Sequence, residues 1–281
     1  PVPAGHHVVK NTGTIDCKLL FFEMKPPMGA PAPAPAEAPA EEAAPAEEAA
    51  PAEEPPKITA EDMANFGKKI ADAAGVDCCA TNPDSYKVIC EIEGKGRMVE
   101  MTLKAGDEDI PHDHPIHYMY VMNGAKLVLT GPDGDPHEVE LPTGAAPIIP
   151  AGPHQVKNIG ETDAHVIFVE PVEMCKPCEP LEGFVSPLTV AANCYDKLAE
   201  DDDWFTGMMT MAPGESDPPH SHLDHMVYVI EGDGVTIYPI DATEGEGSAI
   251  SEDKKMEVPI KPGMAVPVPA GHHVVKNTGT I

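Results

Sequence analysis

The sequence predicts an all-β protein with two barrels of the same kind, and three observations lead to that prediction. Two histidine-rich segments, residues 106–124 and 214–232, carry the same residue types at the same spacing. Each is followed by a Gly- and Pro-rich segment with a further histidine, at 141–161 and 260–280. The rest consists of short alternating runs broken by Gly, Pro and Asp, which is typical of short strands joined by turns.

The histidines of the two first segments are spaced so that their side chains can meet. In each segment a Gly is followed six residues later by a histidine, with further histidines two and five residues on: His112, His114 and His117, then His220, His222 and His225. Residues two apart on a strand share a face, so the first two of each set can converge on one point. Imidazoles gathered inside a barrel form either a metal site or a costly set of buried polar groups.

The second segments supply one more histidine each. His154 and His273 take equivalent places when the segments are aligned on Asn158 and Asn277. The four segments resemble the two motifs of the cupin superfamily, G-x5-H-x-H-x3,4-E-x6-G and G-x5-P-x-G-x2-H-x3-N. The resemblance implies two cupin barrels (double-stranded β-helix or jelly-roll), with these metal ligands: His112, His114 and His154 in the first, and His220, His222 and His273 in the second.

Both segments depart from the family pattern at its glutamate, which is absent. Counted back from the closing Gly, His117 and His225 occupy that place, which makes them additional candidate ligands. Strict strand alternation would turn both outward, so ligation by them needs a bulge. Two strand tyrosines, Tyr118 and Tyr228, have two interpretations: core aromatics, or catalytic phenols that point at the metal and exchange a proton with substrate.

Residues 1–15 recur without change at 267–281. By the resemblance they are the second half of a cupin, so His7 would be a ligand equivalent to His273 in a preceding repeat. The next residues, 16–25, are expected to form a closing strand. We interpret the chain as one period of a tandem array, and the alternative is a permuted unit with an overlap. In an isolated chain, 1–25 would complete the second barrel or pair with a neighbour as a strand-swapped homo-oligomer.

These observations divide the chain into six parts. Recurrent Pro forbids a continuous helix in the Pro/Ala/Glu-rich stretch, which is expected to be a disordered spacer. A helix is expected at 58–76, because this stretch begins at a Thr cap, ends at a Gly and carries an apolar stripe. The expected parts are a cupin fragment at 1–25, the linker at 26–57, a helix at 58–76, cupin domain 1 at 85–171, an inter-barrel linker at 172–187, and cupin domain 2 at 188–281.

Composition limits the partners. The net charge of −29 argues against nucleic acid and anionic membrane surfaces, and no apolar run is long enough to span a membrane. We expect a soluble protein that acts on a small molecule. The sequence starts at Pro1 rather than Met, so it leaves the compartment and a targeting leader open. Seven cysteines without regular spacing are not a disulfide framework, although Cys175 and Cys178 form a CxxC pair in the inter-barrel linker.

The ligand set indicates the chemistry. Three or four neutral imidazoles leave the full charge of a divalent cation on the site, which favours activation of bound water. We expect one metal per cupin domain, zinc first, with Fe, Mn, Ni and Cu also compatible with imidazole. The function predicted first is a zinc-dependent lyase, hydratase or hydrolase, with CO2 hydration as the concrete example. The alternatives are a three-His Fe(II) oxygenase and a non-catalytic metal- or ligand-binding repeat module.

Overall fold

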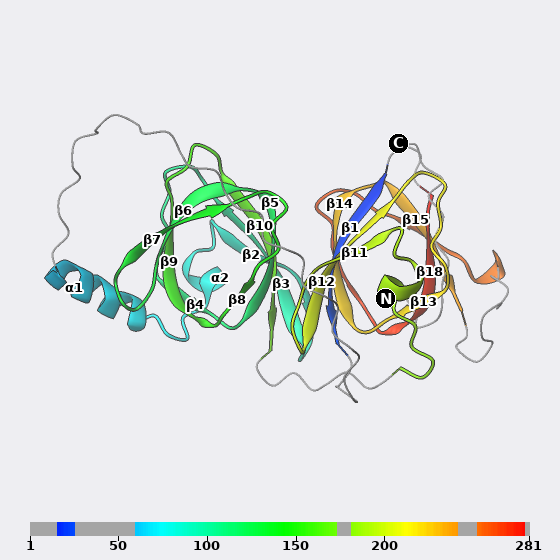
Figure 1. The fold of residues 1–281 in the computed structure, drawn as a ribbon, viewed down its shortest axis with the longest axis horizontal. Helices are drawn as coiled ribbons and strands as arrows, with labels where there is room; N and C mark the ends of the chain where they lie inside the picture. The colour runs from blue at the N-terminus through cyan, green and yellow to red at the C-terminus, as the bar shows by residue number, and fades with distance from the viewer. Residues whose placement is uncertain (1–15, 26–59, 173–180, 241–251, 279–281) are drawn as a thin grey trace, which may run out of the picture.

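The computed structural model describes residues 16–25, 60–172, 181–240 and 252–278, and it confirms the all-β prediction. Two barrels lie side by side (Figure 1). The first contains β2 (Tyr86–Ile92), β3 (Gly96–Leu103), β4 (His112–His114), β5 (His117–Asn123), β6 (Ala125–Thr130), β7 (Pro136–Leu141), β8 (Ile148–Ile149), β9 (Gly152–Asn158) and β10 (Ala164–Pro171). The second contains β1 (Cys17–Met24), β11 (Tyr195–Glu200), β12 (Trp204–Met211), β13 (His220–His222), β14 (His225–Glu231), β15 (Gly234–Pro239), β16 (Met256–Pro259), β17 (Ala265–Val268) and β18 (Gly271–Asn277).

The two barrels have the same strand order. In the first, the sheets run β2-β3-β10-β5-β8 and β4-β9-β6-β7; in the second, they run β11-β12-β1-β14-β17 and β13-β18-β15-β16. Every strand of one barrel therefore has a counterpart in the other, and β1 is the counterpart of β10. All named strand pairs are antiparallel, as expected for a jelly-roll barrel.

The helices lie outside the barrel walls or at their edges. The predicted helix is present as α1 (Ala60–Ala71), at the end of the first barrel that points away from the second (Figure 1). Two short helices, α2 (Cys78–Thr81) and α3 (Pro187–Val190), precede the first strand of each barrel, and a 3-10 turn, η2 (Glu252–Lys254), precedes β16. None of the described helices is both long and apolar enough to cross a membrane.

Strand β1 lies in the middle of a sheet of the second barrel, although it is the first strand in sequence. It pairs with β12 from Cys17↔Met211 to Met24↔Trp204, and with β14 on its other edge. The sequence of β1, CKLLFFEM, is almost continuously apolar, as expected of a strand that is buried on both faces. One face, with Phe21 and Glu23, points into the barrel. The other packs against the first barrel.

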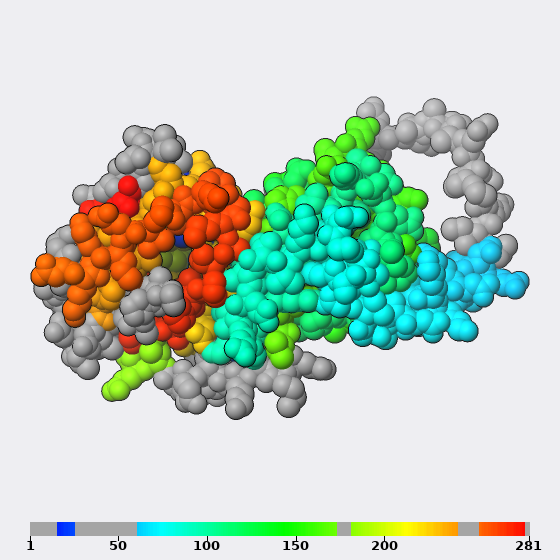
Figure 2. Space-filling model, turned by 180° about the vertical axis from the view of Figure 1, so that it is seen from behind, coloured from blue at the N-terminus to red at the C-terminus, as the bar shows by residue number. Residues whose placement is uncertain are grey.

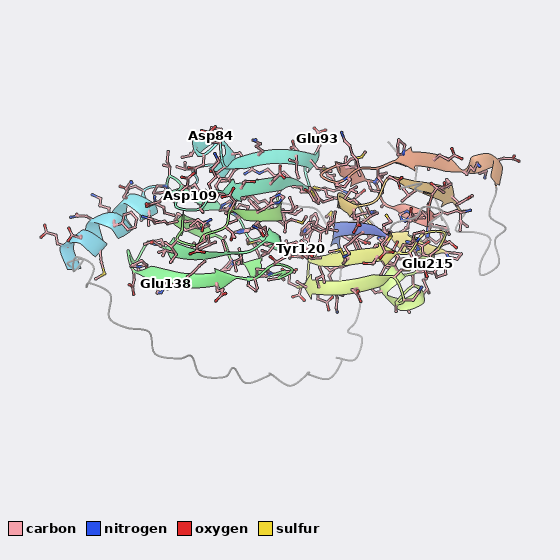
Figure 3. All side chains as sticks on the ribbon, turned by 90° about the horizontal axis from the view of Figure 1, so that it is seen from above. Asp84, Glu93, Asp109, Tyr120, Glu138 and Glu215 are labelled. Atoms are coloured by element: carbon pink, nitrogen blue, oxygen red, sulfur yellow. The ribbon has the colours of Figure 1, made fainter. Side chains whose placement is uncertain are left out.

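A shared apolar core joins the two barrels. Leu20, Phe22 and Met24 of β1 pack in one cluster with residues of the first barrel such as Met98 and Tyr118. The Tyr118 ring lies 6.2 Å from the Trp204 ring, and the Tyr118 hydroxyl donates a hydrogen bond of 2.5 Å to Oδ2 of Asp201. An ion pair between Lys95 and Asp224 also crosses the junction. In Figure 3, Tyr120 lies near this junction, and it packs against the same cluster.

Replacing Phe22 by Ala tests this account of β1. The Phe22 side chain is fully buried, so its loss leaves a cavity that should lower the free energy of unfolding by about 3–5 kcal/mol. Urea unfolding measures the change. The exposed Val88→Ala is the control and should change stability by roughly 0.5 kcal/mol or less. Equal, small effects from both variants would contradict the placement of β1 inside the second barrel.

Candidate metal centres

Strand pairing brings the predicted histidines together. In the first barrel β4 and β9 pair with His112 opposite His154, and His114 follows on the same face of β4. In the second barrel β13 and β18 pair with His220 opposite His273. Nitrogen atoms of His112, His114 and His154 lie within 4.8 Å of one another, and so do those of His220, His222 and His273. Both predicted sets of three are thus assembled.

Backbone carbonyl groups fix the orientation of the His112 and His220 rings. The Nδ1 atoms of His112 and His220 donate to the carbonyl oxygens of residues two positions earlier, at 2.8 Å for Ile110 and 2.9 Å for Pro218. A carbonyl oxygen only accepts, so each Nδ1 carries the proton and each Nε2 keeps a lone pair. The Nε2 of His112 is buried and has no hydrogen-bond partner among the residues that the structure describes. A buried nitrogen lone pair of this kind suits a cation.

A glutamate from the closing strand holds the second histidine in each centre. Oε1 of Glu170 accepts from Nδ1 of His114 at 2.5 Å, and Oε2 of Glu23 accepts from Nδ1 of His222 at 2.5 Å. Both carboxylates act on the ring nitrogen that faces away from the cluster, which fixes the tautomer and raises the basicity of Nε2. The sequence analysis missed these residues. The signal was the matching ends of the two closing strands, FVEP and FFEM.

A buried tyrosine–aspartate pair flanks each centre, and this too was missed. The hydroxyl of Tyr86 donates to Oδ2 of Asp109 at 2.8 Å, and that of Tyr195 donates to Oδ2 of Asp217 at 2.9 Å. The Tyr195 oxygen is also 3.3 Å from Nε2 of His220. Burial raises the pKa of both tyrosines well above the usual value, so the phenols stay protonated. In Figure 3 Asp109 lies between the strand layers of the first barrel.

The two centres differ in how the glutamate charge is balanced. Oε2 of Glu170 accepts from Nε of Arg97 at 2.5 Å, so its charge is paired. In the second barrel the strand residue opposite Glu23 is Phe205, which carries no charge, whereas Arg97 lies opposite Glu170. Oε1 of Glu23 instead accepts from the backbone N–H of Leu223 at 2.7 Å. Burial, partly offset by its neighbours, raises the pKa of Glu23 to about 8. A cation in the second centre would therefore supply the positive charge that Arg97 supplies in the first.

His117 and His225 are inside the barrels, contrary to what strict alternation would give. The strand is interrupted between His114 and His117, and again between His222 and His225, so the alternation restarts and the later ring turns inward. The ring of His117 is 4.7 Å from that of His114, and the ring of His225 is 4.6 Å from that of His222. Neither belongs to a three-histidine group, although His225 forms a group with Glu23 and His222. Both lie beside the clusters.

The same interruption moves Tyr118 and Tyr228 away from the histidines. With His117 turned inward, Tyr118 turns outward, where it bonds Asp201 and packs in the core between the barrels. Tyr228 packs in the same core. Of the two interpretations of these tyrosines, the structure therefore corrects the catalytic one and supports core packing. Tyr86 and Tyr195 hold the positions near the clusters instead.

Three residues that the sequence analysis singled out, His7, Cys175 and Cys178, lie outside the described residues. Cys78 and Cys79 form a group with Asp77 that could hold a metal, but Arg97 already pairs with Asp77 at 2.6 Å and donates to Sγ of Cys78. The contacts with Arg97 therefore explain why these side chains lie together, without a bound ion.

Burial favours the neutral form of several of these histidines. Burial, together with neighbouring histidines, lowers the pKa of His114 to about 3, of His117 to about 4 and of His154 to about 2. In the second barrel burial lowers the pKa of His222 to about 3 and of His225 to about 4. Neutral imidazole is the form that ligates metal, so these rings stay competent at mildly acidic pH.

Comparisons with known proteins found solved structures of cupin proteins at low similarity. No protein-family model and no curated protein matches the sequence. A cupin domain from Bordetella pertussis Tohama I is 25% identical over 31% of this chain and 91% of its own, with a TM-score of 0.29. A cupin 2 conserved barrel domain protein from Leptotrichia buccalis is 17% identical over 69% and 82%, with a TM-score of 0.39.

An RmlC-like cupin with a double-stranded β-helix fold from Methanocaldococcus jannaschii is 16% identical over 29% of this chain and 73% of its own, with a TM-score of 0.25. The strand order and the positions of the motif histidines in this chain themselves give it the cupin fold. The prediction of a cupin fold is confirmed.

The lowered pKa values predict a shallow pH dependence of metal binding. If His114 and His154 titrated at their ordinary 6.5, protons would weaken zinc binding to the first centre about a hundredfold by about pH 5.5. With pKa values of about 3 and about 2 these rings are neutral at about pH 5.5, so we expect the zinc affinity to fall by about tenfold or less. Competition with a chromophoric chelator measures it, in a His220→Ala variant that isolates the first centre. A hundredfold loss would contradict the depressed pKa values.

Proposed function

We propose that each barrel holds one divalent cation, zinc by preference, and that the loaded centres activate water or polarise a small substrate. Hydration of CO2 is the concrete example, and hydrolysis or a lyase step uses the same chemistry. The observation that carries the proposal is the group of three histidines whose nitrogen atoms converge in each barrel. In each group the two histidines of the first strand have Nδ1 fixed by a carbonyl oxygen or a carboxylate.

The residues fit a divalent cation. The three-histidine groups contain no carboxylate, and within the described part of the chain the buried Nε2 of His112 has no hydrogen-bond partner. Three neutral imidazoles are a ligand set of catalytic zinc, and zinc held in this way brings the pKa of bound water to about 7. The neutral set weakens the case for a two-His-one-carboxylate iron oxygenase, whereas a three-His Fe(II) oxygenase uses the same donors.

The surrounding side chains support handling of a proton. The Tyr195 hydroxyl donates to Asp217, so its remaining lone pair can accept a hydrogen bond from a molecule beside His220. Asp217 is fixed in turn, because its Oδ1 accepts from the backbone N–H of Val275 at 3.0 Å. Tyr86 and Asp109 repeat this arrangement, with the Val156 N–H at 2.8 Å from Oδ1 of Asp109. These pairs can orient a small polar substrate in each centre.

The second barrel is hollowed on one face. Figure 2 shows this hollow, framed by the C-terminal strands of the barrel, with atoms of β1 visible at depth. Strand β1 also carries Glu23, whose carboxylate bonds His222 of the second centre. We propose this hollow as the entry for a small molecule.

Metal content tests the ligand assignment. His112→Ala removes one of the three donors of the first centre, so bound zinc should fall from two ions per chain to one. His220→Ala should do the same for the second centre, and the double variant should hold none. His137→Ala is the control, because that side chain is exposed, and it should leave zinc content unchanged. Elemental analysis measures each; full retention of metal in the double variant would exclude these ligands.

Activity of the metal-free protein separates the three classes of function. After chelation, CO2 hydration or ester hydrolysis should disappear and return with zinc, because only the metal supplies the Lewis acid. Stopped-flow and colorimetric assays measure both reactions. Oxygen uptake that returns with Fe(II) and not with zinc would support the oxygenase instead. Metal binding without turnover in any assay would leave a non-catalytic repeat module, with tandem copies adding valency.

A further inference from the structure

Two neighbouring cysteines lie beside the first centre. Cys78 and Cys79 open helix α2, and their Sγ atoms are 3.7 Å apart, so one thiol can donate a hydrogen bond to the other. Cys78 is fully buried, whereas Cys79 is partly exposed. Of the two residues, only Cys79 is therefore open to a solute, and Cys78 lies directly behind it.

The Arg97 guanidinium holds this thiol pair in place. Its Nη2 atom donates to Sγ of Cys78 at 3.8 Å and pairs with Oδ2 of Asp77 at 2.6 Å. Its Nε atom donates to Glu170, the carboxylate that fixes His114. A cation beside a thiol favours the thiolate, which is the form of cysteine that reacts with electrophiles. The thiol pair thus has the surroundings of a reactive site.

The two thiols differ in acidity, in the order that their exposure suggests. The hydrogen bond from Cys78 lowers the pKa of Cys79. Giving that hydrogen bond raises the pKa of Cys78, and burial raises it further. Burial also raises the pKa of the three other described thiols, to about 12 for Cys17 and Cys194 and to about 11 for Cys90. Among the described cysteines, the partly exposed Cys79 is therefore the one whose pKa is lowered.

The second barrel has apolar residues where the first has the thiol pair and its arginine. Helix α3 takes the place of α2, since each begins eight residues before the tyrosine that opens the next strand. Its first two residues are Pro187 and Leu188 instead of two cysteines. Phe205 takes the place of Arg97 opposite the closing-strand glutamate. Because both barrels assemble three histidines and a glutamate, the histidine cluster itself does not require the cysteines.

The spacing of the thiol pair suits a reversible bond rather than a permanent cross-link. The Cα atoms of neighbouring residues are about 3.8 Å apart, closer than the roughly 4.4–6.8 Å that is usual for a disulfide. A disulfide between neighbours is therefore strained, and strained disulfides are readily reduced. An accessible thiol with a second thiol next to it is also the arrangement in which an oxidised cysteine is converted to a disulfide.

We propose that Cys78 and Cys79 form a redox site that takes a hydroperoxide as its oxidant and a dithiol as its reductant. This inference does not depend on the proposed function, because no step of it uses a metal ion. The site is placed beside the first centre by Arg97, which contacts both Cys78 and Glu170.

The oxidation has two steps. The Cys79 thiolate attacks the terminal oxygen of the hydroperoxide; an S–O bond forms, the O–O bond breaks, and the alkoxide takes up the proton that Cys79 had released. Sγ of Cys78 then attacks the sulfur of the Cys79 sulfenic acid; the S–S bond forms, the S–O bond breaks, and the hydroxide leaves as water with the Cys78 proton. The two thiols together lose two electrons, and the peroxide gains them. Exchange with a dithiol restores both thiols and leaves the reductant as a disulfide.

Peptide mass spectrometry of the full chain tests the bond. Trypsin releases residues 70–87, which contain Cys78 and Cys79 and no other cysteine, and residues 88–95, which contain Cys90. The reduced protein is treated with hydrogen peroxide, the peroxide is removed with catalase, and free thiols are blocked with iodoacetamide during denaturation. We expect peptide 70–87 without the block and two hydrogens lighter, and doubly blocked again if dithiothreitol precedes the iodoacetamide. Peptide 88–95 is the control and should carry the block throughout.

A doubly blocked peptide 70–87 after peroxide would overturn the proposal. A peptide that has gained oxygen atoms which dithiothreitol does not remove, or one joined to a different peptide, would overturn it as well.

Two matched variants test the separate roles of the thiols. In Cys78→Ser the sulfenic acid of Cys79 has no thiol beside it, so dimedone, which reacts with sulfenic acids, should label peptide 70–87 after peroxide treatment. In Cys79→Ser the remaining thiol is buried, and we expect about tenfold less label. Equal labelling of the two variants, or stronger labelling of Cys79→Ser, would overturn the assignment of Cys79 as the residue that meets the peroxide. The peptide measurement on the unmodified chain needs neither variant to fold.

Discussion

The hydrogen bonds that fix Nδ1 of His112, His114, His220 and His222 are the constraint on which the two centres depend. A neutral imidazole inside a barrel must satisfy two nitrogens, and the carbonyl oxygens of Ile110 and Pro218 satisfy one on His112 and one on His220. The other nitrogen is left facing its neighbours, in a place from which water is largely excluded. A cation that accepts these lone pairs offsets the cost of burying them. The same hydrogen bonds therefore leave, in each barrel, a group of histidine nitrogens that could hold a metal ion.

Strand β1 links the core, the second centre and the junction between the barrels. Phe22 fills the core shared by the two barrels, while Glu23, the next residue, reaches His222 from the opposite face. Both the packing and the site geometry of the second barrel thus depend on β1. In sequence this strand is separated from the other strands of that barrel by the whole first barrel. The first barrel obtains the same arrangement from β10, with Arg97 added to balance the charge of Glu170. The two centres share a plan but differ in electrostatics.

Local spacing predicted that the first two histidines of each set share a strand face, and the resemblance to the cupin motifs added the third histidine of each group. A histidine two residues after another on a strand shares its face, and the alignment on Asn158 and Asn277 brought in His154 and His273. The exchange of inward and outward faces at His117 and Tyr118 was not predictable, because it depends on a break in the strand that alternation alone does not reveal. Glu170 and Glu23 act over 56 and 199 residues of sequence, and only the closed barrel brings them to His114 and His222.

We propose that imidazole nitrogens are the only ligands that the protein itself supplies to the cation. X-ray absorption spectroscopy at the zinc edge, on the zinc-loaded protein, tests it most directly. The structure predicts a first shell of three or four nitrogens at about 2.0 Å, with the outer-shell scattering of imidazole rings, completed by a light oxygen donor. A sulfur scatterer at about 2.3 Å, or a shell of oxygens without imidazole scattering, would contradict it.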